Sequence, residues 1–402
     1  AAISYHTHSG VILRPMGTTT FRFKVAAAAS LAVILAGVVR STDIIGAQTA
    51  SRALPTEARA PADNPFTPAK VTLGRLLFWD PILSGRKDVA CATCHHPDLG
   101  YADGIDVSIG VNGVGLGGRR RFEEPNAIPF VKRNSQTILN VAFNGLDQSG
   151  HYDPAAAPMF WDLRVASLEA QALAPIESLE EMRGDAYGEA DAGKEVVARL
   201  GKVAEYRTLF RTAFGGNQPV TADNLGKALA AFQRSLLATN SPFDRYTRGD
   251  LSAMTSAQIR GMETFDRVGC ANCHAGPMFS DFKPHVLGVA DNAKVPATDT
   301  GIASGYAFRT PSLRNLRYTA PYMHNGTLAT LQDVLGFYNS GRRRGRNPNV
   351  RRDQLDPLLN QLNVRRGGSD IIEFLNALND DGFDREIPAR VPSGLTPGGL
   401  IR

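Results

Sequence analysis

All four cysteines of this 402-residue chain lie in two CxxCH pentapeptides, CATCH and CANCH. Two thiols three positions apart can add to the two vinyl groups of one haem, and the histidine that follows can bind the iron from the same side. Each pentapeptide therefore predicts one covalently bound c-type haem with its proximal ligand. The predicted residues are Cys91, Cys94 and His95 for haem 1, and Cys270, Cys273 and His274 for haem 2.

Two other uses of paired cysteines fit the sequence less well. Two CxxC pairs can close one tetrahedral zinc site, but zinc does not need the histidine at the fifth position. The separation of Cys94 from Cys270 is also far longer than zinc-ribbon spacing. Thioredoxin-like chemistry expects a βαβ context, which is missing because alternating strand pattern is scarce. The sequence therefore favours a di-haem protein.

The distal side of haem 1 decides whether this haem transfers electrons or performs chemistry. His96 is adjacent to the proximal ligand and cannot turn back across the ring, and His151 lies in a loop where a surface position is favoured. We therefore expect an open distal position that can bind hydrogen peroxide. A non-catalytic di-haem electron carrier is the alternative from another functional class.

Four longer segments contain or follow the pentapeptides. They read LGRLLFWDPILSGRKDVACATCHHPDLGYADG, FWDLRVASLEAQALAPIESLEEM, CANCHAGPMFSD and FRTPSLRNLRYTAPYMHNGTLATLQDVLGFYNSG. In this order they resemble the bacterial di-haem cytochrome c peroxidase and MauG family, most closely its MauG-like and MbnH-like members. The resemblance covers residues 65–380 and implies a peroxide-dependent oxidoreductase with two cytochrome c-like haem domains.

The resemblance implies roles for individual residues of the haem 1 site. Trp161, in FWDLR, matches the tryptophan that conducts electrons between the haems, and Gln171 and Pro175 match distal-pocket positions. Glu181 matches the catalytic glutamate, which suits the chemistry because cleavage of HOOH needs a group that moves a proton from the near oxygen to the leaving one. Glu180 is the adjacent competitor, and either carboxylate without the resemblance fits a solvated helix end.

Two departures from other family peroxidases set the expected subtype. Those enzymes carry a histidine that caps the resting haem 1, whereas SIGVNG places Val111 there, so no reductive uncapping is expected. The haem 2 ligand position that holds methionine in the family's cytochrome c peroxidases, and tyrosine in its MauG-like and MbnH-like members, aligns here with Tyr338, with Met323 as the alternative ligand. A phenolate is a hard anion that favours oxidised iron, whereas a thioether favours ferrous iron. Met278 is interpreted as a packing residue.

The resemblance also implies cofactors and partners. Besides the two covalent haems, one calcium ion is expected at Asn134 and the backbone carbonyls of Thr319 and Pro321, since calcium prefers oxygen ligands. In the preferred interpretation hydrogen peroxide oxidises haem 1, Trp161 shares the oxidising equivalents with haem 2, and the high-valent pair oxidises a protein partner. A cytochrome c peroxidase that reduces peroxide to water with a small electron-donor protein is the alternative.

Helical patterns dominate the elements that must position these residues. Apolar residues recur at helical spacing, and Thr221, Thr255 and Thr330 are the expected N-caps of three helices. The expected helices are Ala166–Ala174, Glu195–Phe214, Thr221–Ala238, 256–265, 331–341 and Ser369–Asn379. The predicted organisation is a leader (1–50), a linker (51–68), a peroxidatic haem 1 domain (69–246), an electron-transfer haem 2 domain (247–380) and a proline-bearing tail (381–402). The predicted class is all-α and loop-rich.

The charges are nearly balanced, with 44 Lys and Arg against 39 Asp and Glu. No nucleic-acid partner is expected, because nucleic-acid binders carry a strong basic field.

Val25–Val39 is an apolar run behind Arg22 and Lys24, shorter than the roughly 20 residues that cross a bilayer. We therefore expect a cleaved secretory signal, a periplasmic protein and no stable membrane span. An arginine-rich stretch from Arg342 to Arg352 fits a docking site for an acidic protein, a haem-propionate site or a solvated face equally.

Overall fold

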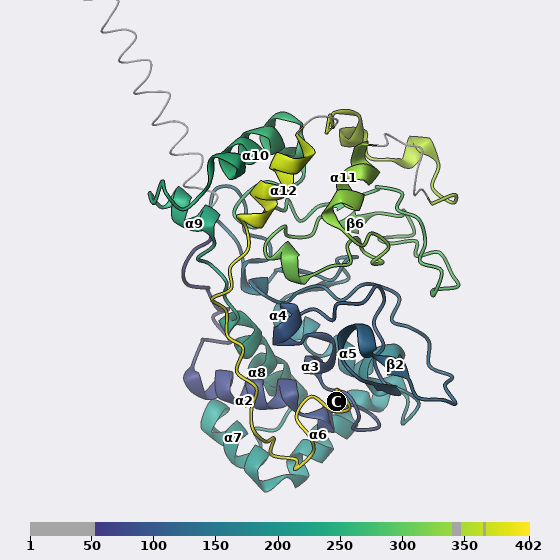
Figure 1. Ribbon diagram of the computed structural model, residues 1–402. Coiled ribbons are helices and arrows are strands. Elements are labelled where there is room, and N and C mark those ends of the chain that lie inside the picture. Colours follow the sequence, from purple (N-terminus) through teal and green to yellow (C-terminus); the bar gives the residue numbers. More distant parts are fainter. Residues whose placement is uncertain (1–52, 340–346, 365–366) are drawn as a thin grey trace, which may run out of the picture. The chain divides into compact units, whose positions relative to one another are not determined.

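The computed structural model describes residues 53–339, 347–364 and 367–402. In these ranges the chain is helical and loop-rich, and the all-α prediction is confirmed (Figure 1). Its strands form three short antiparallel pairs: β1 (Gly113–Val114) with β2 (Arg121–Phe122), β3 (Pro158–Met159) with β4 (Val165–Ala166), and β5 (Pro284–His285) with β6 (Phe308–Arg309). The predicted leader (1–50) and most of the arginine-rich stretch (342–346) lie outside the described residues. None of the described helices is long and apolar enough to cross a membrane.

A first group of helices forms around the contact of α2 (Pro68–Trp79) with α8 (Ala222–Ser235). Thr67 caps α2 by accepting a hydrogen bond from the backbone N–H three residues later (3.3 Å), and proline occupies the first helical position, where no N–H is needed. Gly74 allows the two backbones to approach, because a Cβ there would lie 2.0 Å from the carbonyl oxygen of Ala228. A larger residue at position 74 would therefore push the two helices apart.

The predicted helix Glu195–Phe214 is two helices, α6 (Ala192–Lys202) and α7 (Ala204–Phe214). Val203 between them has extended backbone angles (φ −85°, ψ 113°). The break lets α6 bury Leu200 and α7 bury Tyr206 in the same core, which one straight helix would not do. The prediction of a continuous helix was wrong because periodicity alone does not report a change of direction between two amphipathic segments.

The three predicted threonine N-caps are confirmed. The side chains of Thr221, Thr255 and Thr330 accept hydrogen bonds from the backbone N–H three residues later, at 3.1, 3.2 and 3.1 Å. Such a bond satisfies one of the N–H groups that have no partner inside the helix. Local chemistry therefore sets these helix starts.

A second group of helices carries the second pentapeptide. It consists of α9 (Pro242–Thr247), α10 (Ser256–Arg267), α11 (Leu331–Asn339) and α12 (Gly368–Asn376). At the crossing of α10 and α12, a Cβ on Gly261 would lie 1.9 Å from the carbonyl oxygen of Asp370, so only glycine fits. The core of this group includes the rings of Phe243, Phe265, Phe279 and Phe374. The predicted domain division near residue 246 stays a prediction, although the two helical groups have separate hydrophobic cores.

The segment predicted as a helix over Ala166–Ala174 is interrupted. Ala166 ends strand β4, Ser167 has a left-handed backbone (φ 78°), and only then does α4 (Leu168–Gln171) begin. Ser167 also donates its N–H to the carbonyl of Ala157 (2.9 Å), which ties this corner to the preceding loop. A second short helix, α5 (Ala174–Glu177), follows after a turn. Pairing with β3 overrides the helical composition of the first residues.

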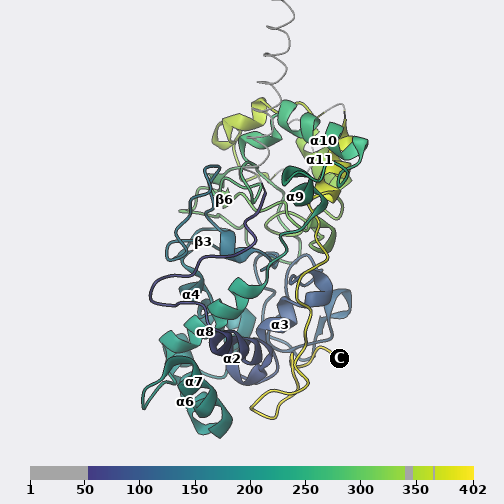
Figure 2. The same cartoon turned by 90° about the vertical axis from the view of Figure 1, so that its left-hand side faces the viewer.

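The predicted tail is an ordered strap. Residues 381–402 run from α12 to the first helical group in both views (Figures 1 and 2). The N–H of Gly398 donates to the carbonyl of Trp79 (2.7 Å), and Thr93, between the two cysteines of CATCH, donates its hydroxyl to the carbonyl of Gly398 (2.9 Å). Phe383 and Val391 are buried in the same core as α2. The tail therefore completes the structure around the first pentapeptide.

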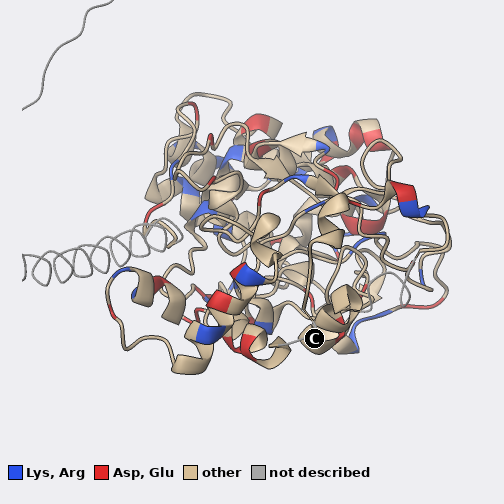
Figure 3. Ribbon diagram, turned by 90° about the horizontal axis from the view of Figure 1, so that it is seen from above, with Lys and Arg blue, Asp and Glu red and all other residues tan. Residues whose placement is uncertain are grey.

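Positive and negative side chains are interspersed along the ribbon. Figure 3 shows Lys and Arg positions close to Asp and Glu positions on many elements. Several form ion pairs between distant segments, such as Arg86 with Asp185 (2.7 Å) and Arg390 with Glu205 (2.8 Å). Exposed pairs of this kind contribute little stability each, because water and salt screen the charges.

Candidate haem sites and the cavity between them

The two proximal histidines have the same arrangement. Nδ1 of His95 lies 2.9 Å from the carbonyl oxygen of Tyr101, and Nδ1 of His274 lies 2.9 Å from that of Phe279. A carbonyl oxygen only accepts, so Nδ1 carries the proton and Nε2 keeps the lone pair that a metal needs. Burial lowers the pKa of both histidines, which keeps them neutral. Both residues therefore fit the axial position of a haem iron.

The cysteines of both pentapeptides are free thiols. The first pentapeptide begins with the single turn α3 (Cys91–Cys94), and the second follows directly on α10. Burial raises the pKa of Cys91, Cys94 and Cys270 to about 12, so these groups are not thiolates. In the described part of the chain the cysteines do not gather into one four-thiol cluster, so the two CxxC pairs do not share a tetrahedral zinc site. The thiols instead suit covalent attachment of haem.

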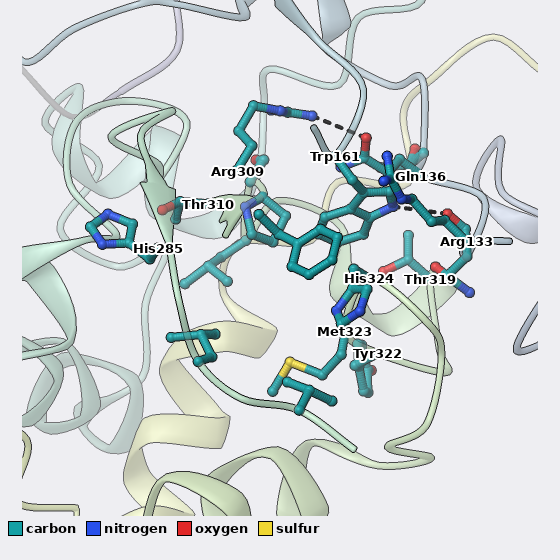
Figure 4. A pocket seen from close by; sticks show the side chains of 18 of the residues that line it. Arg133, Gln136, Trp161, His285, Arg309, Thr310, Thr319, Tyr322, Met323 and His324 are labelled. Carbon is teal, nitrogen blue, oxygen red and sulfur yellow. Dashed lines mark hydrogen bonds between the residues drawn. The ribbon is translucent and has the colours of Figure 1, made fainter. Parts of the chain in front are cut away.

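One cavity of about 600 Å³ joins the two pentapeptides. Its wall holds residues from both predicted haem sites. Figure 4 shows Trp161, Arg309 and Met323 in this wall. The predicted site residues in the wall are Cys94, His95, Asn134, Trp161, Gln171, Pro175, Glu181, Cys270, Cys273, His274, Thr319, Pro321, Met323 and Tyr338. Flat cofactors bound at the two CxxCH segments would therefore face a common space, which suits two haems that exchange electrons.

Glu181 and Glu180 both line the cavity, on the turn Leu179–Arg183, but they differ in environment. Burial, and then the charge of Glu180, raise the pKa of Glu181 above its ordinary value, against an opposing effect of Arg164. Glu180 accepts a hydrogen bond from the hydroxyl of Ser178 (3.1 Å). A carboxyl group whose pKa is raised toward neutrality can both take and return a proton, so Glu181 is the better acid–base candidate.

The loop that carries Val111 packs behind Glu181. Val111 is fully buried, in the core of the first helical group, and does not line the cavity. At the preceding Gly110, a Cβ would lie 2.4 Å from the carbonyl oxygen of Glu181. His96 is buried against Trp79, with ring centroids 5.6 Å apart, and His151 is exposed and bonded to Ser149. Neither histidine is among the cavity-lining residues, so the candidate peroxide site has no histidine cap from these positions.

Tyr338 and Met323 reach the cavity from different elements. Tyr338 lies on α11, and burial together with the nearby thiols of Cys270 and Cys273 raises the pKa of its phenol. Such a phenol loses its proton only if a strong positive charge, such as ferric iron, is bound beside it. Met323 lies on the loop after η8 (Leu316–Tyr318), beside Tyr322 and His324 (Figure 4). The electrostatic neighbours of Tyr338 therefore place it next to the second pentapeptide, whereas the choice between Tyr338 and Met323 as ligand stays a prediction.

Trp161 is held rigidly in the cavity wall. Its indole N–H donates to the carbonyl of Asn134 (3.0 Å), and the N–H of Asn134 donates to the carbonyl of His324 (2.8 Å). The ring of His324 stacks on Phe308 (centroids 3.7 Å apart) and meets Trp161 edge-on at 6.5 Å. Burial lowers the pKa of His324 to about 4, so the ring is neutral. A buried indole with a fixed hydrogen bond reorganises little when it loses an electron, as an electron relay requires.

The predicted calcium residues offer oxygen atoms only. The amide nitrogen of Asn134 donates to the carbonyls of Ile105 (2.9 Å) and Asp106 (3.2 Å), which leaves the side-chain oxygen as the atom for a cation. Thr319 and Pro321 line the same cavity. This neutral donor set fits a calcium ion that retains several waters, and the site stays a prediction.

Sequence reasoning missed two charged groups of the cavity wall. Arg309 is buried and donates to the carbonyl of Phe160 (2.9 Å) and to Gln136 (3.1 Å), and burial lowers its pKa to about 10. No carboxylate of the described residues pairs with Arg309, so its guanidinium fits a carboxylate of a bound haem. No sequence signal distinguishes this arginine from the other arginines of the chain.

The second missed group is the imidazole of His285. Its two nitrogens lie 3.0 Å from an oxygen of Asp281 and 2.5 Å from one of Asp356. These contacts, with Asp281 first and then Cys273, raise the pKa of His285 to about 11, so the ring is positively charged. Asp356 is 71 residues away along the chain, which hides the cluster from any local pattern.

Comparison with known proteins agrees with this geometry. The family model described as di-haem cytochrome c peroxidase matches residues 68–252. The methylamine utilization protein MauG of Methylorubrum extorquens is 38% identical over 71% of this chain and 73% of its own length. The cytochrome-c peroxidase IdrP1 of Denitromonas iodatirespirans is 36% identical over 79% of this chain and 84% of its own. A solved MauG-like protein associated with microbial copper homeostasis covers 81% of this chain and 95% of its own, with TM-score 0.66 and 28% identity.

Proposed function

The chain belongs to the di-haem cytochrome c peroxidase and MauG family of hydrogen peroxide-dependent oxidoreductases with two c-type haems, and on this premise we propose that it oxidises an aromatic side chain of a partner protein. The observation that carries the proposal is the phenol of Tyr338 beside Cys270 and Cys273, in the cavity whose wall also holds Trp161. A hard phenolate ligand favours the oxidised iron that such a reaction needs.

Proton transfer at the peroxide site is assigned to Glu181. Its raised pKa lets the carboxylate accept a proton from the oxygen nearer haem 1 and return it to the leaving oxygen. Gln171 and Pro175 line the cavity with it and shape the space for so small a substrate. The carboxylate is therefore needed in its ionised form before peroxide is cleaved.

The haems, when bound, supply the redox chemistry that stores two oxidising equivalents from one peroxide. His95 and His274 would hold the two irons through Nε2, because Nδ1 of each is committed to a backbone carbonyl. Trp161 provides the oxidisable group between the two sites, and its fixed hydrogen bond to Asn134 keeps its position constant. Arg309 would pair with a haem carboxylate and offset its charge inside the protein.

The experiment is the addition of peroxide to the fully oxidised protein without a reductant. We expect a near-infrared charge-resonance band, which Tyr338→Met abolishes, so that this variant needs half-reduction before it reacts. Met323→Leu is the matched control, because it changes the other candidate ligand in the same cavity and should leave the band intact. The reverse pattern in these two variants would assign the ligand to Met323.

Peroxide reduction to water with electrons from a small donor protein is the second candidate function. It is favoured by the similarity to relatives named cytochrome-c peroxidase and by the presence of Met323 in the cavity wall. A wild-type protein that requires prior reduction and turns over rapidly with reduced cytochrome c would replace the first proposal with this one.

Two further assignments belong to the same proposal. The protein works in the periplasm, because the apolar run Val25–Val39 behind Arg22 and Lys24 fits an export signal and covalent haem attachment fits an exported protein. One calcium ion binds Asn134 and the carbonyls of Thr319 and Pro321. Metal analysis of the purified protein before and after chelation tests the calcium assignment.

A further inference from the structure

Tyr318 lies against the segment that holds the proximal ligand of haem 1. A Cβ on Gly100 would lie 2.4 Å from the Cβ of Tyr318, so the tyrosine packs directly on the backbone at Gly100. The next residue is Tyr101, whose carbonyl accepts the Nδ1 hydrogen bond of His95 (2.9 Å). A short path of contacts and bonds therefore joins the haem 1 ligand to the phenol ring of Tyr318.

Aromatic rings provide a second, parallel contact between the same groups. The ring of Tyr101 lies 6.1 Å from that of Phe383, and the ring of Phe383 lies 5.6 Å from that of Tyr318, both edge-to-face. Tyr101 is fully buried, whereas Tyr318 is half-buried. The chain of rings thus leads from the core beside haem 1 to a residue that solvent reaches.

Tyr318 has the partners that a redox-active phenol needs. Its hydroxyl donates to a carboxylate oxygen of Asp381, and its oxygen accepts a hydrogen bond from Arg385 (3.2 Å). Loss of an electron makes a phenol strongly acidic, and Asp381 is placed to take the proton. Arg385 can continue to donate to the oxygen of the neutral radical.

Tyr101, nearer the haem, lacks such a partner. Its hydroxyl donates to the backbone carbonyl of Asp384 (2.8 Å), and a carbonyl is far too weak a base to take the proton. Phe383 has no ionisable group and a ring that is harder to oxidise than a phenol. An oxidising equivalent that leaves haem 1 by this route is therefore stabilised at Tyr318 and not before it.

We propose that Tyr318 and Asp381 form a second oxidation site, at which a soluble one-electron donor reduces the enzyme without entering the cavity. The proposal rests on the proposed function, because peroxide must first oxidise the haems. Tyr318 then loses one electron to the oxidised haem 1 site and its phenol proton to Asp381. A donor, such as a phenol or a reduced redox protein, gives one electron back, and the proton returns from Asp381. Two such cycles use the two equivalents of one hydrogen peroxide, which ends as two waters after taking up two protons.

The test locates the radical in the haem-loaded full chain. Peroxide is added in the presence of the nitroso spin trap 2-methyl-2-nitrosopropane, and mass spectrometry of the digested protein maps the adduct. We expect the adduct on Tyr318, its loss in Tyr318→Phe and a several-fold weaker adduct in Asp381→Asn. Tyr152→Phe is the matched control, because the hydroxyl of this half-buried tyrosine is bonded to the backbone N–H of Arg59 (2.7 Å) and not to a carboxylate.

Optical spectra of the haems keep this proposal separate from the proposed function. If the haem spectrum of the wild type responds to peroxide but the adduct on Tyr318 is absent, or is unchanged in Asp381→Asn, the second site is refuted and the proposed function stands. If the haem spectrum does not respond, both fail. In the absence of any donor, we also expect the oxidised haem spectrum to decay several-fold more slowly in Tyr318→Phe than in the wild type or in Tyr152→Phe. Equal decay in all three would again contradict the role of Tyr318.

Discussion

Replacement of Glu181 by glutamine tests the acid–base assignment most directly. Glutamine has nearly the shape of glutamate, so it can occupy the space between the cavity and the loop at Gly110, where the backbones are in close contact. It cannot accept and return a proton. We therefore expect both haems to be attached and the overall fold to be kept, while the reaction with peroxide becomes slow.

The expected loss of rate in Glu181→Gln follows from the acid–base role of the carboxylate. General acid–base catalysis contributes about 10²- to 10⁴-fold, or about 3 to 5 kcal/mol of activation free energy. We expect a loss within this range, because burial raises the pKa of Glu181 above its ordinary value and so favours its action as both base and acid.

Stopped-flow absorbance of the haems after mixing with peroxide measures this loss. The wild-type rate constant should fall as the pH is lowered through the raised pKa of Glu181, since protonation removes the base that starts the reaction. Glu181→Gln should abolish this fall of the rate constant at low pH, and it should also lower the rate constant at higher pH. Glu180→Gln is the matched control and should keep both the fall at low pH and the wild-type rate constant at higher pH.

Two results would contradict the assignment. An unchanged rate in Glu181→Gln, with loss of rate in Glu180→Gln, would transfer the role to Glu180. If Glu181→Gln reacts slowly but its rate constant still falls at low pH as in the wild type, another group causes the pH dependence. The loss of rate would then come from a change of shape at position 181.

Three other predictions address the haem environments and stability. Since Val111 is buried and His151 is exposed, ferric haem 1 should be five-coordinate and high-spin by electron paramagnetic resonance, whereas two low-spin signals would contradict this. Trp161→Phe should keep the peroxide rate in stopped-flow experiments but lose the near-infrared band, because phenylalanine fills the site and is much harder to oxidise. Burial raises the pKa of Asp103 to about 6 from 3.8, so the folded chain binds more protons than the unfolded chain between these values. The contribution of Asp103 to the free energy of unfolding should therefore fall by about 3 kcal/mol as the pH rises through this window, and Asp103→Asn should remove that contribution in urea denaturation.

Features that depend on neighbours along the chain could be predicted from the sequence. The two CxxCH pentapeptides specify thiols and histidine within one turn, and the threonine caps act over three residues. The resemblance added Trp161, Glu181 and Tyr338, which the structure brings to one cavity although they come from separate loops and helices. No composition or periodicity would have joined them.

Features that depend on distant contacts could not be predicted. The ion cluster of His285 needs Asp356, and the bond from Tyr318 needs Asp381, each more than sixty residues away. Arg309 is distinguished only by its burial and by the absence of an acidic partner in the described ranges, and neither is visible in a sequence. The tail reads as an irregular, proline-bearing segment because its few apolar residues, among them Phe383 and Val391, have no regular period.

The contacts of the strap, residues 381–402, also affect the order in which parts of the protein fold. The hydroxyl of Thr93, inside the first pentapeptide, donates to the carbonyl of Gly398, 305 residues later. This bond cannot form until residue 398 has been synthesised. Contacts this distant form late, because the entropy of a long loop must be overcome before they stabilise anything. We therefore expect Cys91 and Cys94 to stay accessible to haem until this contact forms. On this order, residues 381–402 pack against the first helical group after haem attachment at Cys91 and Cys94.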